Sequence, residues 1–306
     1  MSGERRTPAR FGPARRMAWP CLLALASCAH AAPPASQFPS AAHALEQLRA
    51  TYRCATGVKG EAKIDQFSEA GRLRGKLLLF ASRPDRLRFD VVSPPPFNSI
   101  VSTLTTDAGV FALADQRARK FYEGTASACN IARLTEVPIE AQALVMLLGG
   151  QAPLLVHRDA ETKLEWNGHG YYVVQIAGNH GASEELHIAP AAADFSKPWQ
   201  AQRLRVLDVR VAQQGIELYH AELGDHAWLS TAPPLVDPDG LDAPLAPSGP
   251  SCTVEVPRKL HIEVVESGQD VLFRYDEVKL NPPLPAGVFA QPVPDGMARE
   301  RLDCSR

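Results

Sequence analysis

Apolar and polar residues alternate along most of the chain from Gly57 onward. The clearest case is a pair of segments, residues 76–80 and 86–91, separated by the turn-forming residues 82–85. Because successive side chains of a strand point to opposite faces of a sheet, this pattern predicts a hairpin with one apolar and one polar face. Similar segments predict further strands near residues 99–106, 110–115, 118–122, 152–157, 162–166, 170–177, 183–189, 202–211, 215–222, 253–256, 260–266 and 270–277. Together they indicate a mainly β protein built as an antiparallel meander.

Two segments depart from this alternation and carry apolar residues at helical spacing. The first is residues 41–53, which follow the potential N-cap Ser40. The second lies within residues 124–150, where Pro138 suits the first turn of a helix and Gly149 its end. The predicted order is therefore a helix, strands, a helical insertion and more strands.

Residues 1–27 have the order of a bacterial lipoprotein signal peptide. Five arginines precede an apolar run over residues 17–27, which at about half the length of a membrane-spanning helix is too short to cross a bilayer. The run ends in Leu-Ala-Ser-Cys, a lipobox, and processing there would leave Cys28 as the first residue, carrying lipid with palmitate among its acyl groups. Ala29 after this cysteine favours sorting to the outer membrane. The alternative is an ordinary signal peptide cleaved near Ala32.

The remaining chain divides into three parts. Residues 28–39 are small, broken by proline and unpatterned, so we expect a flexible tether. Residues 40–306 form one predicted domain. Within it, residues 231–250 contain six prolines and are expected to form an exposed loop rather than a central strand.

Charge and cysteine content narrow the function further. Without residues 1–27 the chain keeps 27 basic and 33 acidic residues, which gives no indication of a nucleic-acid partner. Four cysteines remain beyond Cys28, an even number in a chain addressed to an oxidising compartment: Cys54, Cys129, Cys252 and Cys304. They predict two disulfides. Of the three possible pairings we favour Cys54 with Cys129 and Cys252 with Cys304, because each would join segments that meet if the termini and a helical lid pack on one sheet.

Common catalytic and metal-binding motifs are absent from the sequence. It contains no Gly-x-Ser-x-Gly elbow, no phosphate-binding Gly-rich loop, no His-Glu-x-x-His and no dinucleotide fingerprint. The spacing of the cysteines is not that of a zinc site. Several histidines lie beside carboxylates, but we expect these side chains to face solvent: His187, His220 and His226, with Glu184, Glu185 and Asp225. The chain is thus expected to be no enzyme and to hold no metal or cofactor, unless folding assembles a polar hydrolase cleft.

Three passages within the predicted domain resemble the LolA/LolB family of lipoprotein-localisation proteins. The first is residues 82–94 (SRPDRLRFDVVSP), where a strand leads into a Ser-Pro loop. The second is residues 100–121, a succession of three short strands. The third is residues 275–289 (YDEVKLNPPLPAGVF), followed by residues 292–296, which is similar to the closing strand and Asn-Pro-x-Leu-Pro tail of the family. The chain is longer than a typical LolB-like receptor, chiefly through residues 179–250, so the resemblance implies a diverged member.

The resemblance implies a strongly curved, incomplete antiparallel β-barrel with a helical lid over an apolar cavity that receives acyl chains. Alternation along the strands then predicts which side chains line the cavity. These residues are Leu77, Leu79, Leu87, Phe89, Val91, Ile100, Leu104, Val271 and Phe273, with Leu144 and Leu147 facing them from the lid. The alternative is that the same residues form a solid core beneath the helices.

The loop formed by residues 93–98 is the predicted membrane contact. Pro95 and Pro96 stiffen it, and Phe97 at its tip matches the hydrophobic loop residue that LolB-like proteins are thought to insert into the membrane. The alternative is that Phe97 folds into the mouth of the barrel.

These expectations combine into one functional hypothesis. The chain is expected to be an outer-membrane lipoprotein, anchored through Cys28 and facing the periplasm, that binds acyl chains of lipids or lipoproteins. It would assist lipoprotein transport as a chaperone, with a periplasmic carrier as a further possible partner. The alternative is an envelope scaffold or sensor that uses the same fold without lipid transfer.

Overall fold

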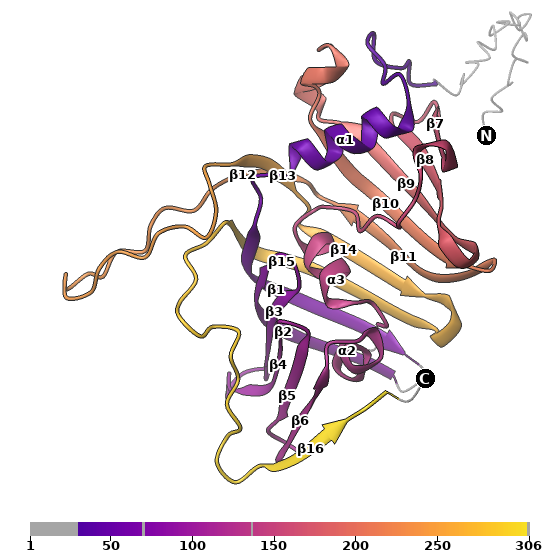
Figure 1. Ribbon diagram of the computed structural model, residues 1–306. Helices are drawn as coiled ribbons and strands as arrows, with labels where there is room; N and C mark the ends of the chain where they lie inside the picture. Colours follow the sequence, from indigo (N-terminus) through magenta and orange to yellow (C-terminus); the bar gives the residue numbers. More distant parts are fainter. Residues whose placement is uncertain (1–29, 69–70, 136, 305–306) are drawn as a thin grey trace, which may run out of the picture. The chain divides into compact units, whose positions relative to one another are not determined.

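One large curved β-sheet dominates the computed structural model of the protein (Figure 1). The structure describes residues 30–68, 71–135 and 137–304, so the predicted signal peptide and Cys28 lie outside the described residues. Residues 31–306 belong to one unit. In its described part, fourteen strands form the main sheet in the order β16-β6-β5-β4-β3-β2-β1-β15-β14-β11-β10-β9-β8-β7. The mainly β, open and strongly curved architecture expected from the sequence is confirmed.

Buried and more exposed residues alternate regularly along β8 and β14, whereas β4 carries four buried residues in succession. The bounds of the strands in the main sheet are β1 (Gly57–Ser68), β2 (Gly71–Ser82), β3 (Arg86–Val92), β4 (Ile100–Asp107), β5 (Val110–Asp115), β6 (Lys120–Thr125), β7 (Thr162–Trp166), β8 (Tyr172–Ala177), β9 (Ala182–Pro190), β10 (Leu204–Gln213), β11 (Ile216–Gly224), β14 (Lys259–Val264), β15 (Gln269–Leu280) and β16 (Ala298–Leu302). Two further strands, β12 (Ala227–Ser230) and β13 (Thr253–Val256), pair with each other in a small second sheet.

The middle of the main sheet joins distant parts of the chain. β1 pairs with β15 in antiparallel register, with Val58 opposite Leu280. At the far edge β16 lies parallel to β6. Register shifts interrupt four of the strand pairings, including β1 with β15 and β3 with β4. Such bulges increase local twist and bend a sheet, which helps to explain its curvature.

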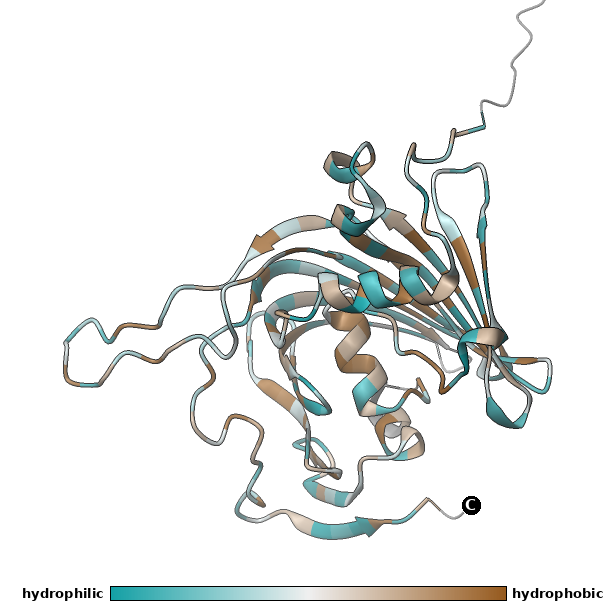
Figure 2. Cartoon of the chain, turned by 45° about the horizontal axis from the view of Figure 1, so that its top comes forward, coloured by the Kyte–Doolittle hydropathy of each residue, from teal (hydrophilic) through white to brown (hydrophobic). Residues whose placement is uncertain are grey.

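In the described part of the chain, three α-helices lie on the concave face of the sheet (Figure 1). α1 (Ala41–Thr51) packs against β7 and β10, α2 (Ala128–Thr135) against β5, and α3 (Ala141–Leu148) against β2 and β3. Figure 2 shows apolar residues concentrated on α3, whereas α1 is amphipathic. Ser40 caps α1 as expected, since its hydroxyl accepts a hydrogen bond from the backbone N–H of His43. None of the helices in the described part of the chain has both the length and the hydropathy to span a bilayer.

One predicted strand is absent. Residues 152–157 are irregular and belong to no strand. The backbone N–H of Leu155 donates to Glu184 Oε2 on β9 at 2.8 Å, and the side chains of Leu154 and Leu155 pack on the core. The apolar character of Leu154 and Leu155 therefore reflects packing on the core rather than strand pairing.

The disulfides connect Cys54 with Cys252 and Cys129 with Cys304, so the pairing favoured from the sequence is wrong. Cys129 lies on α2, directly after β6, and Cys304 follows β16. Because β16 pairs with β6, these two cysteines are brought together. The sequence gives little signal for this parallel pairing of a short, charged terminal strand.

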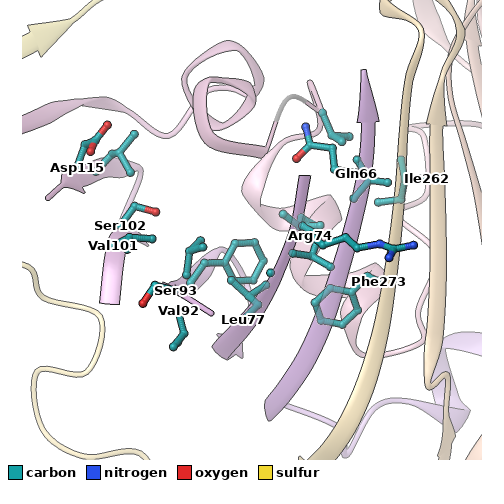
Figure 3. A pocket seen from close by; sticks show the side chains of 18 of the residues that line it. Gln66, Arg74, Leu77, Val92, Ser93, Val101, Ser102, Asp115, Ile262 and Phe273 are labelled. Atoms are coloured by element: carbon teal, nitrogen blue, oxygen red, sulfur yellow. The ribbon is translucent and has the colours of Figure 1, made fainter. Parts of the chain in front are cut away.

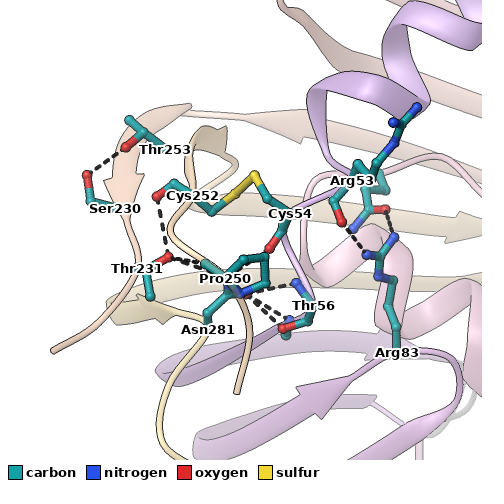
Figure 4. Close-up of a disulfide and its surroundings, with 12 residues drawn as sticks. Arg53, Cys54, Thr56, Arg83, Ser230, Thr231, Pro250, Cys252, Thr253 and Asn281 are labelled. Carbon is teal, nitrogen blue, oxygen red and sulfur yellow. Dashed lines mark hydrogen bonds between the residues drawn. A yellow bond between two sulfur atoms is a disulfide. The ribbon is translucent and has the colours of Figure 1, made fainter. Parts of the chain in front are cut away.

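The other disulfide lies beside a buried asparagine of the C-terminal motif, Asn281 (Figure 4). Its Oδ1 accepts from the backbone N–H of Thr56 at 2.8 Å, and its Nδ2 donates to the carbonyl oxygens of Cys54 at 2.8 Å and Pro250 at 3.0 Å. One carboxamide thus joins the end of α1, the start of β1 and the end of the proline-rich loop. These hydrogen bonds give the asparagine of the Asn-Pro motif a structural role.

Residues 31–39, expected to be a flexible tether, are held against the body. The backbone N–H of Ala31 donates to the carbonyl of Gly168 at 2.7 Å, and Trp166 Nε1 donates to the carbonyl of Ala31 at 2.9 Å. Further along, the Ser36 hydroxyl accepts from the backbone N–H of Trp199, and Phe38 is 5% exposed. Aromatic burial fixes this segment although its composition is that of a linker.

The proline-rich loop projects from the unit between β12 and β13 (Figure 1). It doubles back on itself through paired backbone hydrogen bonds between Leu235 and Leu245. Leu241 near its tip is 87% exposed.

Candidate functional site

A cavity of about 590 Å³ opens on the concave face beside α3. Its apolar wall comes from β1 to β6, β14, β15, β16, α3 and the residues before α3. The apolar lining residues are Ile64, Leu77, Phe89, Val91, Val92, Val101, Leu113, Tyr122, Val137, Ile139, Leu144, Leu148, Leu260, Ile262, Val271, Phe273 and Leu302. Figure 3 shows lining side chains from separate strands arranged around one space. This volume lies within the range of about 300–1,000 Å³ that is usual for small-molecule sites.

α3 forms one side of the cavity because of its residue spacing. Leu144 and Leu148 are four residues apart and therefore share one face of the helix, the face directed at the cavity. Tyr275 supports the helix end from below, since its hydroxyl donates to the carbonyl of Leu148 at 3.3 Å in a fully buried contact. This hydrogen bond thus joins the end of α3 to β15 beside the cavity.

Four charged residues line the cavity at its solvent-exposed margin, on β2, β5, the turn after β5 and β16, and Figure 3 shows Arg74 and Asp115 on different sides of the space. Arg74, Asp115, Arg117 and Glu300 contribute to the lining there. Arg74 Nε donates to Asp65 at 3.1 Å and Glu300 accepts from Lys120 at 3.0 Å, while Asp115 accepts from the backbone N–H of Arg117 at 2.9 Å. The cavity therefore combines long apolar walls with a charged margin.

Six of the residues predicted to line the cavity do so: Leu77, Phe89, Val91, Leu144, Val271 and Phe273. Four others, Leu79, Leu87, Leu104 and Leu147, are at most 1% exposed and belong to the solid core instead. Leu79, Phe89 and Leu104 lie opposite one another across three strands, so all three share the concave face. Alternation identifies the face correctly, but α3 packs on part of it and leaves the cavity farther along the strands.

The prediction for Ile100 is wrong because of a β-bulge. The register between β3 and β4 shifts at Val91 and Val92, so that Val91 faces Ser102 while Val92 faces Ile100. The side chain of Ile100 turns outward and is 43% exposed, and Val101 lines the cavity in its place. Simple alternation cannot locate such an insertion.

Several lining residues were missed. The same alternation along β1 and β14 could have identified Ile64, Leu260 and Ile262. By contrast, Glu300 and Leu302 lie on β16, and only its pairing with distant β6 brings them to the cavity. Local sequence carries no comparable signal for them.

The loop of residues 93–98 begins at the cavity and ends in solvent. Ser93 and Pro94 line the cavity, whereas Phe97 is 80% exposed and does not fold into the mouth. The base of the loop is closed by the Ser93 backbone N–H donating to the Ser99 carbonyl at 2.9 Å and by contact between the two hydroxyls at 3.2 Å. Because these contacts join the two ends of the loop, and Ser93 lines the cavity, Phe97 lies on a short loop next to the cavity.

The expectation that the histidines and carboxylates noted in the sequence face solvent is wrong for Glu184 and His220, which are buried. Glu184 alternates with Glu185 on β9 and lies on the apolar concave face, 2% exposed, where burial raises the pKa of its carboxyl group to about 8. Glu185 and His187 lie on the opposite face, 3.0 Å apart. His220 contacts Asp208 at 2.6 Å, while His226 contacts the carbonyl of Val206 instead. Burial lowers the pKa of His226 to about 4.

No family model and no curated protein matches the chain. Among solved structures, the fold is similar to that of a LolA superfamily protein from Nitrosomonas europaea, with 13% identity and a TM-score of 0.48 over 81% of this chain and 97% of that one. A putative outer membrane lipoprotein-sorting protein domain from Vibrio parahaemolyticus has 9% identity and a TM-score of 0.48 over 80% and 95% of the two chains. A DUF1329 family protein from Desulfovibrio piger has 9% identity and a TM-score of 0.46 over 79% and 97%.

Proposed function

We propose that this protein is an outer-membrane lipoprotein that binds acyl chains of lipids or lipoproteins in its concave cavity, without catalysis, and assists their delivery at the periplasmic face of the membrane. The observation that carries the proposal is the cavity of about 590 Å³ with walls of aliphatic and aromatic side chains. A polar substrate would find few hydrogen-bond partners along these walls, whereas an acyl chain requires no hydrogen bonds.

The energetics suit reversible binding. Each methylene group that leaves water gains about 0.8 kcal/mol, so a chain of about 16 carbons gains about 13 kcal/mol on entering an apolar site. The same chain gains a similar amount in a bilayer, so the difference between cavity and membrane is small. An aliphatic cavity that stays open to one side can therefore accept a chain and release it again.

The charged margin supports a ligand with a polar head. Arg117 is exposed at the margin, and no hydrogen bond or ion pair of its guanidinium group is found among the described residues. Arg74 is already shared with Asp65, which leaves Arg117 as the group best able to approach an anionic headgroup. The acyl chain would then extend from this margin toward Phe273 and Leu144.

Phe97 supports contact with a membrane. An exposed aromatic side chain on a short loop closed at its base is typical of a residue that enters an apolar phase. Since Ser93 and Pro94 of the same loop line the cavity, insertion of Phe97 would place the cavity close to the bilayer surface. In the sequence only Ala29 and His30 separate Cys28 from the docked Ala31, so a lipid on Cys28 would tie the body to the membrane through a short connection.

The first experiment asks whether the cavity holds lipid. The protein is purified from bacterial membranes in mild detergent, extracted with organic solvent and analysed by mass spectrometry, and binding of a dansyl-labelled fatty acid is measured after delipidation. Leu144→Trp on the cavity side of α3 should reduce probe binding by at least tenfold, because the indole occupies the space. Gln142→Trp, on the exposed side of the same helix, is the matched control. Equal probe binding by the Leu144→Trp variant and the control would refute the proposal. A wild-type protein that contains no lipid and does not bind the probe would favour the scaffold or sensor alternative.

The second experiment tests the loop. Phe97→Glu should weaken binding of the delipidated protein to liposomes and slow lipid transfer, while probe binding in the cavity stays unchanged. Val110→Glu, which alters another exposed apolar residue, is the control. Unchanged liposome binding and transfer in Phe97→Glu would rule out a membrane role for this loop.

A further inference from the structure

The convex face of the sheet carries a cluster of one histidine and three carboxylates on β11, β14 and β15: Glu222, His261, Glu263 and Asp270. Along β14, Leu260 and Ile262 line the cavity, so the residues that alternate with them face the other side of the sheet. The cluster is therefore separated from the cavity by the thickness of the sheet. In register, His261 lies opposite Glu222, and Glu263 lies opposite Asp270.

The imidazole of His261 is held between these carboxylates. Its Nε2 lies 2.8 Å from Asp270 Oδ1 and 3.6 Å from Glu263 Oε1. Its Nδ1 lies 3.4 Å from Glu222 Oε2. One ring nitrogen thus faces two carboxylates, and the other is oriented by a third.

The charge of the cluster is not balanced by lysine or arginine. In the described part of the chain, every ion pair of Glu222, Glu263 and Asp270 is with a histidine. The neighbouring pair of His220 and Asp208 differs, because Arg210 Nε donates to Asp208 at 3.2 Å. The imidazoles of His220 and His261 are therefore the positive partners that these three carboxylates have within ion-pair distance among the described residues.

His261, Glu263 and Asp270 lie close enough together for one ion to contact all three. A donor atom from each of His261, Glu263 and Asp270 lies within 4.8 Å of the other two. Zinc bonds of about 2.0–2.2 Å to nitrogen and oxygen in a tetrahedron separate the ligand atoms by about 3.3 Å. The observed separations of 2.8 Å and 3.6 Å from Nε2 lie on either side of this value. The side chains of Glu263 and Asp270 are 45% and 44% exposed, which leaves an entry path from solvent.

We infer that His261, Glu263 and Asp270 form a binding site for one divalent transition-metal ion of the Zn²⁺ type, with Glu222 as the residue that orients the imidazole. Imidazole with carboxylates suits such ions, and the outer hydrogen bond from the second ring nitrogen to a carboxylate is the usual companion of a metal-binding histidine. The ion would offset two of the three negative charges of the cluster and connect β14 with β15 near the middle of the sheet. The fourth position would be open to water.

The test uses the full chain, treated with chelator and dialysed, and titrated with ZnCl₂ by isothermal calorimetry. Co²⁺ is added in parallel, because its visible absorption reports the coordination geometry. The wild-type protein should bind one Zn²⁺ per chain and melt at a higher temperature in its presence. His261→Ala and Asp270→Asn should abolish saturable binding, and Glu222→Gln should weaken it about 10–100-fold. His180→Ala, at an exposed turn, should bind as the wild type does.

Circular dichroism of each variant in EDTA establishes that loss of binding is not loss of folding. Absence of saturable Zn²⁺ binding by the wild type, or wild-type affinity in His261→Ala, would overturn the inference. The Leu144→Trp variant should still bind Zn²⁺, because the cavity lies on the other face of the sheet. Loss of Zn²⁺ binding and loss of lipid binding can therefore be distinguished from each other.

Discussion

The buried carboxyl group of Glu184 makes the stability of this protein depend on pH in an unusual direction. Its side chain lies on the apolar face of β9 and is 2% exposed. Oε2 accepts the backbone N–H of Leu155, but buried Oε1 has no hydrogen-bond partner among the described residues. Burial raises the pKa of this group from 4.5 to about 8, because the surroundings oppose the negative charge.

The sign and size of the effect follow from linkage. Between pH 4.5 and about 8 the unfolded chain has released this proton and the folded chain has retained it, so stability falls as pH rises. Each pH unit in this window costs about 1.4 kcal/mol, which amounts to about 3.5 kcal/mol between about pH 5 and pH 8. The contribution is fully present below the pKa of the unfolded chain and is lost as pH rises through that of the folded one.

The perturbation is Glu184→Gln, which keeps an acceptor for the Leu155 N–H but cannot ionise. The free energy of unfolding is measured by urea denaturation at intervals from pH 5 to pH 8, for the wild type and the variant. The variant minus wild-type difference should increase by about 3.5 kcal/mol across this range. Comparing differences cancels the titration of all other groups, as well as any constant cost of the buried amide.

Glu185→Gln is the matched control, because Glu185 is adjacent in sequence but lies on the opposite, solvent-facing side of the strand and pairs with His187. Its difference from wild type should change by less than about 1 kcal/mol, as for a surface ion pair. If the Glu184→Gln difference is as flat as that of the control, or falls with pH, the reasoning about burial at this site is wrong.

Three further substitutions test contacts that hold the fold, each followed by urea denaturation. Asn281→Ala should lower the free energy of unfolding by about 3 kcal/mol, since it leaves buried backbone groups without partners; a loss under about 1 kcal/mol would contradict this role. Replacing both Cys129 and Cys304 by serine should cost about 2–5 kcal/mol, because the bond joins residues 175 apart and restricts the unfolded chain; equal stability of the oxidised wild type and the variant would exclude it. Asp194→Asn should cost about 1.5–3 kcal/mol, because this carboxylate accepts charge-assisted hydrogen bonds from Arg203 and Lys197, whose side chains are 38% and 45% exposed; a loss under about 0.5 kcal/mol would show that these contacts contribute little.

The proposed lipid site and the proposed metal site use the two faces of the same strands. Along β14, Leu260 and Ile262 face the cavity while His261 and Glu263 face away. This arrangement follows from the period of two along a strand, which keeps apolar and polar chemistry on separate sides. A change on one face therefore leaves the other nearly untouched, so the two proposals can be tested independently.

Much of the secondary structure could be predicted from local sequence. The hairpin of β2 and β3 and the capped helix after Ser40 are encoded by neighbouring residues, and both are present. The apolar segment 152–157 shows the limit, because packing on a core and pairing within a sheet require the same residue types. Composition was equally ambiguous for residues 31–39, where Phe38 is buried in the core.

The sequence by itself determined the strand-rich fold class, the two-sided character of the strands and the face on which Leu77, Val91 and Phe273 lie, because these depend on a period that is read within a few residues. The tertiary structure alone decided where along that face the cavity opens, how the cysteines pair, and that His261 meets Asp270 and Glu222. These depend on bulges, on the placement of α3 and on the pairing of strands far apart in the chain. Local alternation carries no information about them, since many registers and pairings satisfy the same apolar pattern.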